Sequence, residues 1–476
     1  MTAKPATATR MALPALGLVG LGTMGANFAR NLARNGARLA LLDADPARAT
    51  TLAAELGAGA TPTSSLAALA AALPRPRAIF LLVPAGDAVD AALAELLAVL
   101  EPGDAVIDGG NSFWRDTARR TSTAAAKGID FLGFGVSGGA EGALRGPAIM
   151  AGGAAAAVDR LAPLFRAVAA RHGDEPCLVA CGPGGAGHFG KMVHNGIEYA
   201  VMQMIAEAFV LLRDHHAMDV PRIAATMKPW ADGEAGSFLL DCALRALAAR
   251  DADGSPLLDA IADTASQKGT GSWAAIAALE LGVPAPSLAE AVFARCLSAL
   301  RAERVAAAAA MSPVPAGAGA PPAAIADIHA GLIGAAVSVH AQGFALVVAA
   351  SREHGWGTDI AAVARAWRSG CIIRSRLMER IADALAGAPH GADLLRVDAI
   401  ARVARDAEPG WRRMLAAATA RATPLPAFAS ALAHLDGTRQ ARSGAHLVAA
   451  QRDVFGRHGF RRLDREGSFH AEWTSP

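Results

Sequence analysis

Four polar residues, Lys191, His194, Asn195 and Glu198, are spaced so that they share one face of a helix. Apolar residues surround them in the sequence, which predicts that this polar stripe lies inside the protein, where its members need partners or a ligand. Burial disfavours charge, so it would lower the pKa of the lysine and raise the pKa of the glutamate. Such a pair could act as a base and an acid. The alternative is a solvated helix face with a weak ion pair between Lys191 and Glu198.

The composition favours the chemical interpretation. Arginine predominates among the basic residues, and the only lysines are Lys4, Lys127, Lys191, Lys228 and Lys268. A lysine can lose its proton in a protein, whereas an arginine cannot. The rare lysine at the start of the polar stripe is therefore suited to proton transfer.

A glycine-rich turn near the N-terminus indicates a dinucleotide-binding unit. A predicted strand over 16–19 is followed by Gly20-Leu21-Gly22-Thr23-Met24-Gly25, then by a helix, and then by a strand over 38–42 that leads into Asp43. Glycines at this spacing let the backbone approach a pyrophosphate at the helix N-terminus. The acid about twenty residues downstream can accept hydrogen bonds from a ribose. The full context of strand, turn, helix, strand and acid makes the motif informative.

Further strands are predicted over 78–83, 105–108 and 130–134, with helical patterns between them. This alternation indicates a mostly parallel sheet with helices on both faces. Two of the strands lead into polar, glycine-rich turns, 108–112 and 135–139. Ligands of such sheets bind beyond the carboxyl ends of the strands, so these turns are candidate binding loops. The alternative is that they are only tight turns.

Beyond about residue 188 the pattern is helical, for example over 289–310 and 325–352. The predicted fold class is therefore an α/β Rossmann-like N-terminal domain followed by a large all-α domain and an extended C-terminal tail. Residues 328–351 carry no Asp, Glu, Lys or Arg and are long enough to span a membrane. His340 and Gln342 within this run favour a buried core helix, so we expect no membrane.

The formal net charge is +2 and the arginines are scattered, so we expect no nucleic-acid partner. The five cysteines are widely spaced, which is typical of reduced thiols in a cytoplasmic protein and predicts neither disulfides nor a zinc site. A local anion site is indicated by Lys268 and Thr270, which share a polar loop, and by Arg295, whose charge needs a partner in an apolar helical run. The alternative for the loop is a helix start with an exposed lysine.

Taken together, the chain resembles the decarboxylating 6-phosphogluconate dehydrogenases from about residue 16 to residue 473. The resemblance rests on runs that occur in one order: 107–112, 135–139, 185–199, 267–271, 291–297, 370–375 and 451–453. It implies oxidative decarboxylation of 6-phosphogluconate to ribulose 5-phosphate and CO2 in the pentose phosphate pathway, with reduction of a nicotinamide coenzyme and without a metal. It also implies a homodimer with shared active sites, in which the tail of each subunit reaches the other.

The resemblance also implies roles for individual residues. Lys191 would be the general base and later acid, and Glu198 the general acid. The residues expected to hold the sugar acid are Asn111, Ser137, Gly138, Gly139, His194 and Asn195, and those expected to hold its phosphate are Tyr199, Lys268, Thr270 and Arg295, with Arg452 and His458 supplied by the partner. The coenzyme is expected at Gly20, Leu21, Gly22, Thr23, Met24, Gly25, Asp43, Ala44, Asp45, Val83, Pro84, Ala85 and Asn111. The expected domains are a loose extension over 1–13, a Rossmann domain over 14–187, a helical substrate and dimerisation domain over 188–442, and the tail over 443–476.

The chain departs from the family pattern at three places. Ala140 stands where an acidic residue is frequent, Pro84 stands where a lysine is usual, and Asp43-Ala44-Asp45 replaces the usual Asn-Arg-Thr. A carboxylate at the end of the second strand accepts the ribose hydroxyls of NAD but repels the 2′-phosphate of NADP. We therefore expect NAD to be preferred. Arg48 is the counter-argument, because it could turn back onto a 2′-phosphate.

Two other functions fit parts of the sequence. A simple β-hydroxyacid dehydrogenase would share the first glycine-rich turn and the Ser-Gly-Gly turn, but it would not need Lys268, Arg295 and Arg452. A non-catalytic, dinucleotide-sensing scaffold would keep the fold, but Lys191 and Glu198 argue against a loss of turnover.

Overall fold

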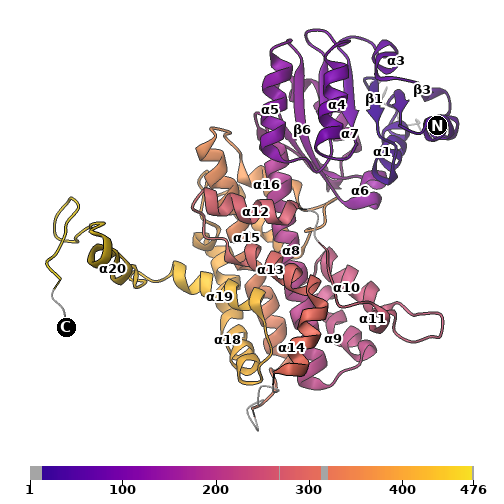
Figure 1. Ribbon diagram of the computed structural model, residues 1–476. Helices are drawn as coiled ribbons and strands as arrows, with labels where there is room; N and C mark the ends of the chain where they lie inside the picture. The colour runs from indigo at the N-terminus through magenta and orange to yellow at the C-terminus, as the bar shows by residue number, and fades with distance from the viewer. Residues whose placement is uncertain (1–12, 267–268, 312–319, 474–476) are drawn as a thin grey trace, which may run out of the picture.

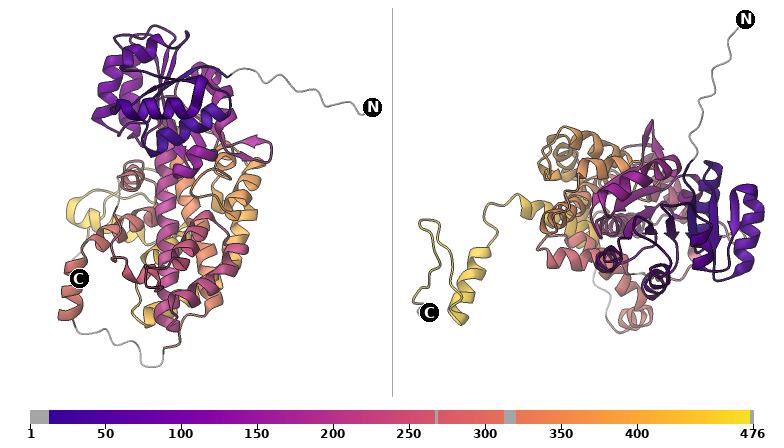
Figure 2. Two further views of the ribbon diagram at one scale, coloured as in Figure 1. Left: turned by 90° about the vertical axis from the view of Figure 1, so that its right-hand side faces the viewer. Right: turned by 90° about the horizontal axis from the view of Figure 1, so that it is seen from above.

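The computed structural model describes residues 13–266, 269–311 and 320–473, and it has three parts (Figure 1). An N-terminal α/β domain sits on one end of a helical domain, and a C-terminal segment stands away from both (Figures 1 and 2). The predicted fold class is thereby confirmed. The expectations for residues 1–12 and for Lys268 lie outside the described residues.

The N-terminal domain contains an eight-stranded sheet in the order β10-β7-β6-β5-β4-β1-β2-β3. The strands are β1 (Leu16–Val19), β2 (Leu39–Leu42), β3 (Ala60–Pro62), β4 (Ala78–Leu81), β5 (Ala105–Asp108), β6 (Asp130–Ser137), β7 (Ala148–Gly152) and β10 (Leu178–Gly182). Neighbouring strands are parallel except β6 and β7, which are antiparallel. The mostly parallel sheet was predicted correctly. A separate two-stranded sheet pairs β8 (Arg171–His172) with β9 (Glu175–Pro176).

Helices cover both faces of the large sheet. They are α1 (Thr23–Arg34), α2 (Pro46–Leu56), α3 (Leu66–Ala71), α4 (Asp87–Leu96), α5 (Trp114–Ala125), α6 (Gly139–Arg145) and α7 (Ala155–Val168). One face buries a cluster that includes Phe28, Phe80 and Phe165, and the other buries a cluster around Val89 and Phe131. Side chains that alternate along a strand point to opposite faces, so the strands supply both clusters.

The strand predictions differ from the structure at specific places. The strand predicted over 78–83 ends at Leu81, whereas the strand predicted over 130–134 continues to Ser137. β6 contains Gly133 and Gly135, and glycine lowers the strand signal. These glycines have a packing role, because a Cβ at Gly135 would lie 2.4 Å from Cβ of Lys191. The strand therefore brings its backbone directly against the polar stripe.

The helical domain is built around α8 (Ala186–His216), a 31-residue helix that begins below the sheet and runs through the whole domain (Figure 1). The other helices are α9 (Val220–Asp232), α10 (Phe238–Ala248), α11 (Leu257–Ala260), α12 (Thr270–Glu280), α13 (Pro286–Ala299), α14 (Arg301–Ala310), α15 (Ile325–Glu353), α16 (Ile360–Ala366), α17 (Arg376–Ala386), α18 (Asp398–Ala420), α19 (Pro426–Thr438) and α20 (Ala445–Gly456). The helical pattern predicted over 289–310 forms two helices, because α13 and α14 are separated at Leu300, where ψ is 47°. No residue of α14 is buried, so no apolar face holds it in line with α13.

The apolar run near residue 328 forms α15, which packs along α8 and α18. Within the described residues it is the one helix that is long and apolar enough to cross a membrane, and 72% of its most apolar stretch is buried inside the protein. Its polar Gln342 is also partnered, since Nε2 donates to Ser287 Oγ at 3.0 Å. The prediction of a buried core helix is therefore confirmed.

Candidate active site

The polar stripe of α8 lies inside the protein, as its spacing predicted. Lys191 is 7% exposed and His194 is fully buried, while Asn195 is also buried and the Glu198 side chain keeps 20% of its surface exposed. Solvent can therefore reach the otherwise buried stripe at Glu198. The solvated helix face, which was the alternative, is thereby excluded.

Burial shifts the pKa values of Lys191 and Glu198 in opposite directions. Burial lowers the pKa of Lys191, and the nearby Glu198 carboxylate only partly offsets this effect. Burial raises the pKa of Glu198, against the influence of Lys191 and Arg295. Both directions agree with those expected from the sequence. Burial thus favours the neutral amine of Lys191 and the protonated carboxyl of Glu198, which are the forms of a base and an acid.

His194 connects the stripe to the end of β6. Its Nε2 lies 3.1 Å from Ser137 Oγ, and its Nδ1 lies 3.2 Å from Asn195 Oδ1. Burial and the charge of Lys191 hold the pKa of His194 well below its usual value, so the ring is neutral. An amide oxygen only accepts hydrogen bonds, which assigns the proton to Nδ1 and makes Nε2 the acceptor for the Ser137 hydroxyl. The imidazole thus fixes both a serine and an asparagine that were predicted to hold substrate.

The turn after β6 needs its glycines. Gly138 and Gly139 have φ values of 111° and 63°, a region that favours glycine. A Cβ at Gly138 would also lie 2.4 Å from the carbonyl oxygen of Gly370. The segment from Ser137 to Gly139 therefore presents backbone at the end of the sheet, beside the buried stripe.

The loop after β5 is held by Asp108, the last residue of this strand. Asp108 accepts hydrogen bonds from Gly110 N–H at 3.0 Å and from Ser112 Oγ at 2.6 Å. Asn111, which lies between these two donors, is exposed. The structure thus places Asn111 at the open edge of the loop, although none of the described contacts involves its side chain.

A buried arginine that was not among the predicted site residues supports this loop. Arg120 on α5 is fully buried and donates to both carboxylate oxygens of Asp90 and to the carbonyl oxygen of Gly86, which precedes α4. Its Nη1 lies 3.7 Å from Asp108 Oδ2. Arg120 thereby ties the turn after β4 to the turn after β5. An arginine on an amphipathic helix usually faces solvent, so its type and position alone could not have revealed this role.

Three of the predicted phosphate ligands converge beside Glu198. The guanidinium carbon of Arg295 lies 3.4 Å from the ring centroid of Tyr199, and a Cβ at Gly271 would lie 2.6 Å from the same ring. Thr270 is buried in the first turn of α12. Among the described residues no carboxylate lies within ion-pair distance of Arg295, so its charge is available to an anion.

Arg452 and His458 lie elsewhere. Both are exposed, on α20 and just after it, in the segment that stands away from the body of the chain (Figures 1 and 2). A single chain therefore does not bring them to its own polar stripe.

The first glycine-rich turn fits a dinucleotide. Gly20 has a φ of 90°, and a Cβ at Gly25 would lie 1.9 Å from the carbonyl oxygen of Gly20, so both positions require glycine. At Gly22 nothing lies within 4 Å of a built Cβ, and no side chain caps α1 there. The remaining positions of the turn, Leu21, Thr23 and Met24, lie at the same helix start. The open N-terminus of α1 is therefore suited to a pyrophosphate.

The residues after β2 are tied to that turn. Asp43 accepts hydrogen bonds from the N–H groups of Leu21 and Asp45, the latter at 3.0 Å. Asp45 caps α2 by accepting from Ala47 N–H at 3.0 Å, and its other oxygen lies 3.5 Å from Arg48 Nε. Val83, Pro84 and Ala85 form the turn between β4 and α4, at the same end of the sheet. No group of three or more His, Cys, Asp and Glu side chains able to hold a metal occurs in the part of the chain that the structure describes.

Comparisons with known proteins cover almost the whole chain. Residues 15–182 match the family described as the NAD binding domain of 6-phosphogluconate dehydrogenase, and residues 187–473 match its C-terminal domain. The decarboxylating 6-phosphogluconate dehydrogenase of Synechococcus elongatus is 41% identical over 97% of this chain and 100% of the relative. The Bacillus subtilis relative, described as NADP(+)-dependent, is 38% identical over 96% of this chain and 98% of its own. A structure of 6-phosphogluconate dehydrogenase from Plasmodium falciparum, described in apo form and in complex with NADP+ or 6-phosphogluconate, superposes with a TM-score of 0.90 at 32% identity, over 96% of this chain and 100% of that one.

Proposed function

The chain belongs to the decarboxylating 6-phosphogluconate dehydrogenase family, and from this premise we propose that Lys191 and Glu198 are its base and its acid. The reaction is the oxidative decarboxylation of 6-phosphogluconate to ribulose 5-phosphate and CO2, with reduction of a nicotinamide coenzyme. Family membership over the full length decides against a simple β-hydroxyacid dehydrogenase. The observation that carries the proposed roles is the burial of a lysine and a glutamate on one face of α8.

Lys191 acts first in this proposal. Its neutral amine accepts the proton of the carbon-3 hydroxyl, while the bound nicotinamide supplies the chemistry of hydride acceptance. The product of this step is a β-keto acid, which loses CO2 readily because the departing electron pair can move onto the ketone oxygen. Lys191, now an ammonium, stabilises the negative charge that develops there. The lowered pKa of Lys191 supports the first step, because it increases the fraction of neutral amine.

Glu198 completes the reaction. The enolate oxygen takes the proton of Lys191, which gives the enediol. The Glu198 carboxyl then delivers a proton to carbon 1 while the neutral amine of Lys191 takes back the hydroxyl proton, which yields ribulose 5-phosphate. The raised pKa of Glu198 supports this role, because it increases the fraction of protonated carboxyl. Its partly exposed side chain can then recover a proton from solvent.

The substrate is held at both ends in the proposed complex. Ser137, His194 and Asn195, with Asn111 and the backbone of Gly138 and Gly139, bind the sugar acid near Lys191. Tyr199, Thr270 and Arg295 bind the phosphate, together with Lys268, which lies outside the described residues. The hydrogen bonds that join His194 to Ser137 and Asn195 support this arrangement, because they orient three polar side chains before substrate arrives.

We also propose that the coenzyme is NAD in preference to NADP. Asp43 uses two of its roughly four acceptor positions for backbone N–H groups, which leaves positions for ribose hydroxyls. Ala44 offers no cation, and Asp45 engages Arg48, which was the counter-argument from the sequence. A second arginine near this turn, Arg30, is also engaged, since it donates to both oxygens of Glu55. No uncommitted cation therefore supports a 2′-phosphate among these described residues.

A homodimer with shared active sites is proposed for the quaternary structure. The C-terminal segment exposes Leu447 and Phe455, and α13 exposes Phe293 and Leu297, all by more than half of their surface. Large apolar side chains in such numbers favour contact with a second copy. Placing Arg452 and His458 at the partner's phosphate site would add two cations to a site that holds a doubly charged group. The free thiols of all five cysteines agree with a cytoplasmic location, which we propose as well.

The experiment that tests this function compares the two coenzymes at saturating 6-phosphogluconate, following both reduced coenzyme and released CO2. We expect one CO2 per reduced coenzyme and a higher kcat/KM with NAD. The double variant Asp43→Asn with Ala44→Arg should shift the ratio toward NADP about tenfold or more, since a hydrogen bond to a charged group contributes about 1.5–3 kcal/mol. Reduced coenzyme without CO2 would contradict the reaction, whereas a wild-type ratio that favours NADP would contradict only the coenzyme preference.

A further inference from the structure

The C-terminal segment is folded around one carboxylate. Asp453 is the one buried residue of α20, at 1% exposure. Its Oδ1 accepts from Gly459 N–H at 2.9 Å and lies 2.7 Å from His470 Nδ1. Its Oδ2 accepts from Ala471 N–H at 3.2 Å and from Trp473 Nε1–H at 2.8 Å. All four contacts come from residues that follow the helix.

These contacts close the segment on itself. Phe460 and Phe469 pair as an isolated antiparallel bridge, with two backbone hydrogen bonds of 2.9 Å, so the chain turns back toward α20. Burial opposes ionisation of Asp453, but the hydrogen bonds from Trp473, His470 and the backbone outweigh it and hold the pKa below its usual range. The carboxylate therefore stays charged and keeps its partners. The C-terminal segment, which stands away from the rest of the chain, is thus ordered by contacts among its own residues.

The two residues proposed to reach the partner flank this centre. Arg452 directly precedes Asp453, and His458 directly precedes Gly459, whose N–H group the same carboxylate accepts. The His458 ring lies against Gly456, where a Cβ would be 2.6 Å from two ring atoms, and contacts the ring of Phe455 at 5.8 Å between centroids. The backbone turns sharply between them, since Arg457 has a φ of 49°. One carboxylate therefore sets the spacing between Arg452 and His458.

We propose that Asp453 is a positioning residue that holds Arg452 and His458 ready, as a fixed pair, for the phosphate bound in the other subunit. The inference rests on the proposed function of the C-terminal segment and adds how that segment is prepared. A disordered arm would have to be ordered each time substrate binds, which weakens binding. An arm folded around Asp453 avoids that cost before the two subunits meet.

The test uses the full-length dimer and separates the Michaelis constants of the two substrates. In Asp453→Asn the side chain keeps its size but loses its charge and one acceptor oxygen, so we expect KM for 6-phosphogluconate to rise about tenfold while KM for the coenzyme stays within about twofold. Asp464→Asn is the matched control, because Asp464 forms an exposed ion pair with Arg462 in the same segment. That control should leave both constants unchanged.

Further variants separate positioning from folding. Gly456→Ala places a methyl group against the His458 ring and should raise the same KM without touching Asp453. Trp473→Phe removes one donor to Asp453 but keeps an aromatic ring, and it provides the measurement if Asp453→Asn fails to dimerise. In a background of Arg452→Ala, Asp453→Asn should add much less to KM than it does alone.

The outcomes distinguish this inference from the function on which it rests. If Arg452→Ala itself leaves KM for 6-phosphogluconate unchanged, the proposed role of the segment at the phosphate fails, and the positioning role fails with it. If Arg452→Ala raises that KM but Asp453→Asn, Gly456→Ala and Trp473→Phe do not, only the positioning role is overturned. Equal effects of Asp453→Asn on both Michaelis constants would also overturn it, because a general loss of structure is not selective.

Discussion

Lys191 and Glu198 share one helix face, and in the proposed mechanism each changes the proton affinity of the other. In the proposed mechanism Lys191 is neutral before oxidation, so Glu198 experiences mainly burial, which raises its pKa. After Lys191 has accepted a proton, its positive charge lowers the pKa of Glu198 and makes the carboxyl a stronger acid. Glu198 would thus release its proton most easily as Lys191 takes back the hydroxyl proton of the enediol. The order of the two proton transfers thus follows from the electrostatic interaction between two side chains on the same helix face.

At the residue scale, Glu198→Gln should separate the late proton transfer from oxidation. The amide cannot donate a carboxyl proton, so we expect steady turnover to fall by about 10²–10⁴-fold, the range for a general acid. A first turnover of reduced coenzyme and CO2 should still appear in a rapid-mixing experiment. Glu280→Gln, on the exposed end of α12, is the control and should behave like wild type. Loss of the first-turnover burst would place Glu198 in the oxidation step instead.

At the element scale, α8 is positioned by close contacts at both of its ends. Near its start the backbone of β6 lies against it at Gly133 and Gly135. Further along, the buried carboxylate of Glu207 accepts from Ala427 N–H at 2.9 Å and Phe428 N–H at 3.1 Å, at the start of α19. Burial raises the pKa of Glu207 to about 7, while these hydrogen bonds favour its charged form. The catalytic helix is therefore fixed to the sheet and to the last helix of the domain.

Gly135→Ala tests the contact between β6 and α8. The added Cβ would lie 2.4 Å from Cβ of Lys191 and 2.9 Å from the carbonyl oxygen of Gly187, so α8 must move. We expect kcat to fall about a hundredfold, because a shift of about 1 Å in a catalytic group can cost that much. Unfolding free energy should drop by about 1–3 kcal/mol. Gly387→Ala, where nothing lies within 4 Å of the new atom, is the control; unchanged kcat in Gly135→Ala would show that the strand does not position Lys191.

The elements near the site could be predicted to different degrees. The stripe on α8 was predictable because four polar residues at helical spacing contradict their apolar surroundings. Strands β3, β7 and β10 were missed because they are short and rich in small residues, which leaves a weak strand pattern. Neither Arg120 nor Asp453 could be assigned from sequence, since their roles depend on partners far along the chain or on burial that no local pattern signals.

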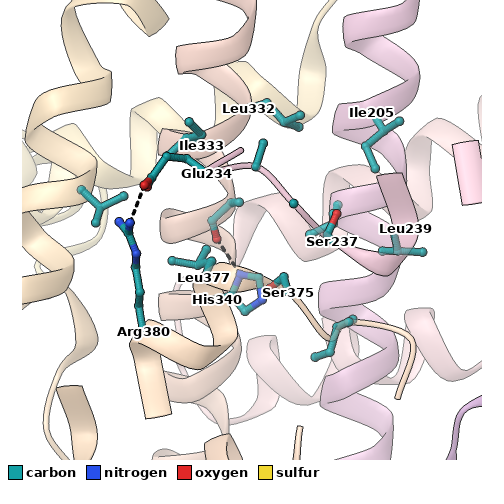
Figure 3. A pocket seen from close by; sticks show the side chains of 16 residues that line it. Ile205, Glu234, Ser237, Leu239, Leu332, Ile333, His340, Ser375, Leu377 and Arg380 are labelled. Atoms are coloured by element: carbon teal, nitrogen blue, oxygen red, sulfur yellow. Dashed lines mark hydrogen bonds and ion pairs between the residues drawn. The ribbon is translucent and has the colours of Figure 1, made fainter. Parts of the chain in front are cut away.

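At the scale of the whole molecule, the residues proposed to bind the phosphate fall into two separate groups in one chain. Tyr199, Thr270 and Arg295 lie together beside the stripe, while Arg452 and His458 stand away from it (Figure 1). The pocket in Figure 3, with Glu234, His340 and Arg380 among its lining residues, lies one turn beyond the stripe along α8 at Val201 and is mainly apolar. It offers no cation that is free of a partner, since Arg380 is paired with Glu234. A phosphate would therefore be bound at the first group of residues, with help from a second subunit.

Subunit mixing tests this arrangement. Dimers of Lys191→Arg lack the base, and dimers of Arg452→Ala lack the cation from the partner, so each should be nearly inactive at low 6-phosphogluconate. After mixing and exchange, we expect about a quarter of wild-type activity, because half of the dimers are mixed and each carries one intact site. Mixing Lys191→Arg with Glu198→Gln is the control and should restore nothing, since both changes lie on α8. Failure of the first mixture to gain activity, with subunit exchange verified, would contradict shared active sites.

The role of Lys191 as the base is tested most directly by measuring the turnover of Lys191→Arg together with its binding of 6-phosphogluconate. A guanidinium keeps its proton, so the variant should fold and bind substrate within a few-fold of wild type, while oxidation falls by about 10²–10⁴-fold, the contribution of a general base. Lys228→Arg, at an exposed lysine paired with Asp232, is the control and should keep full activity. Near-normal turnover in Lys191→Arg would show that another group accepts the proton and would contradict the role of Lys191 as the base.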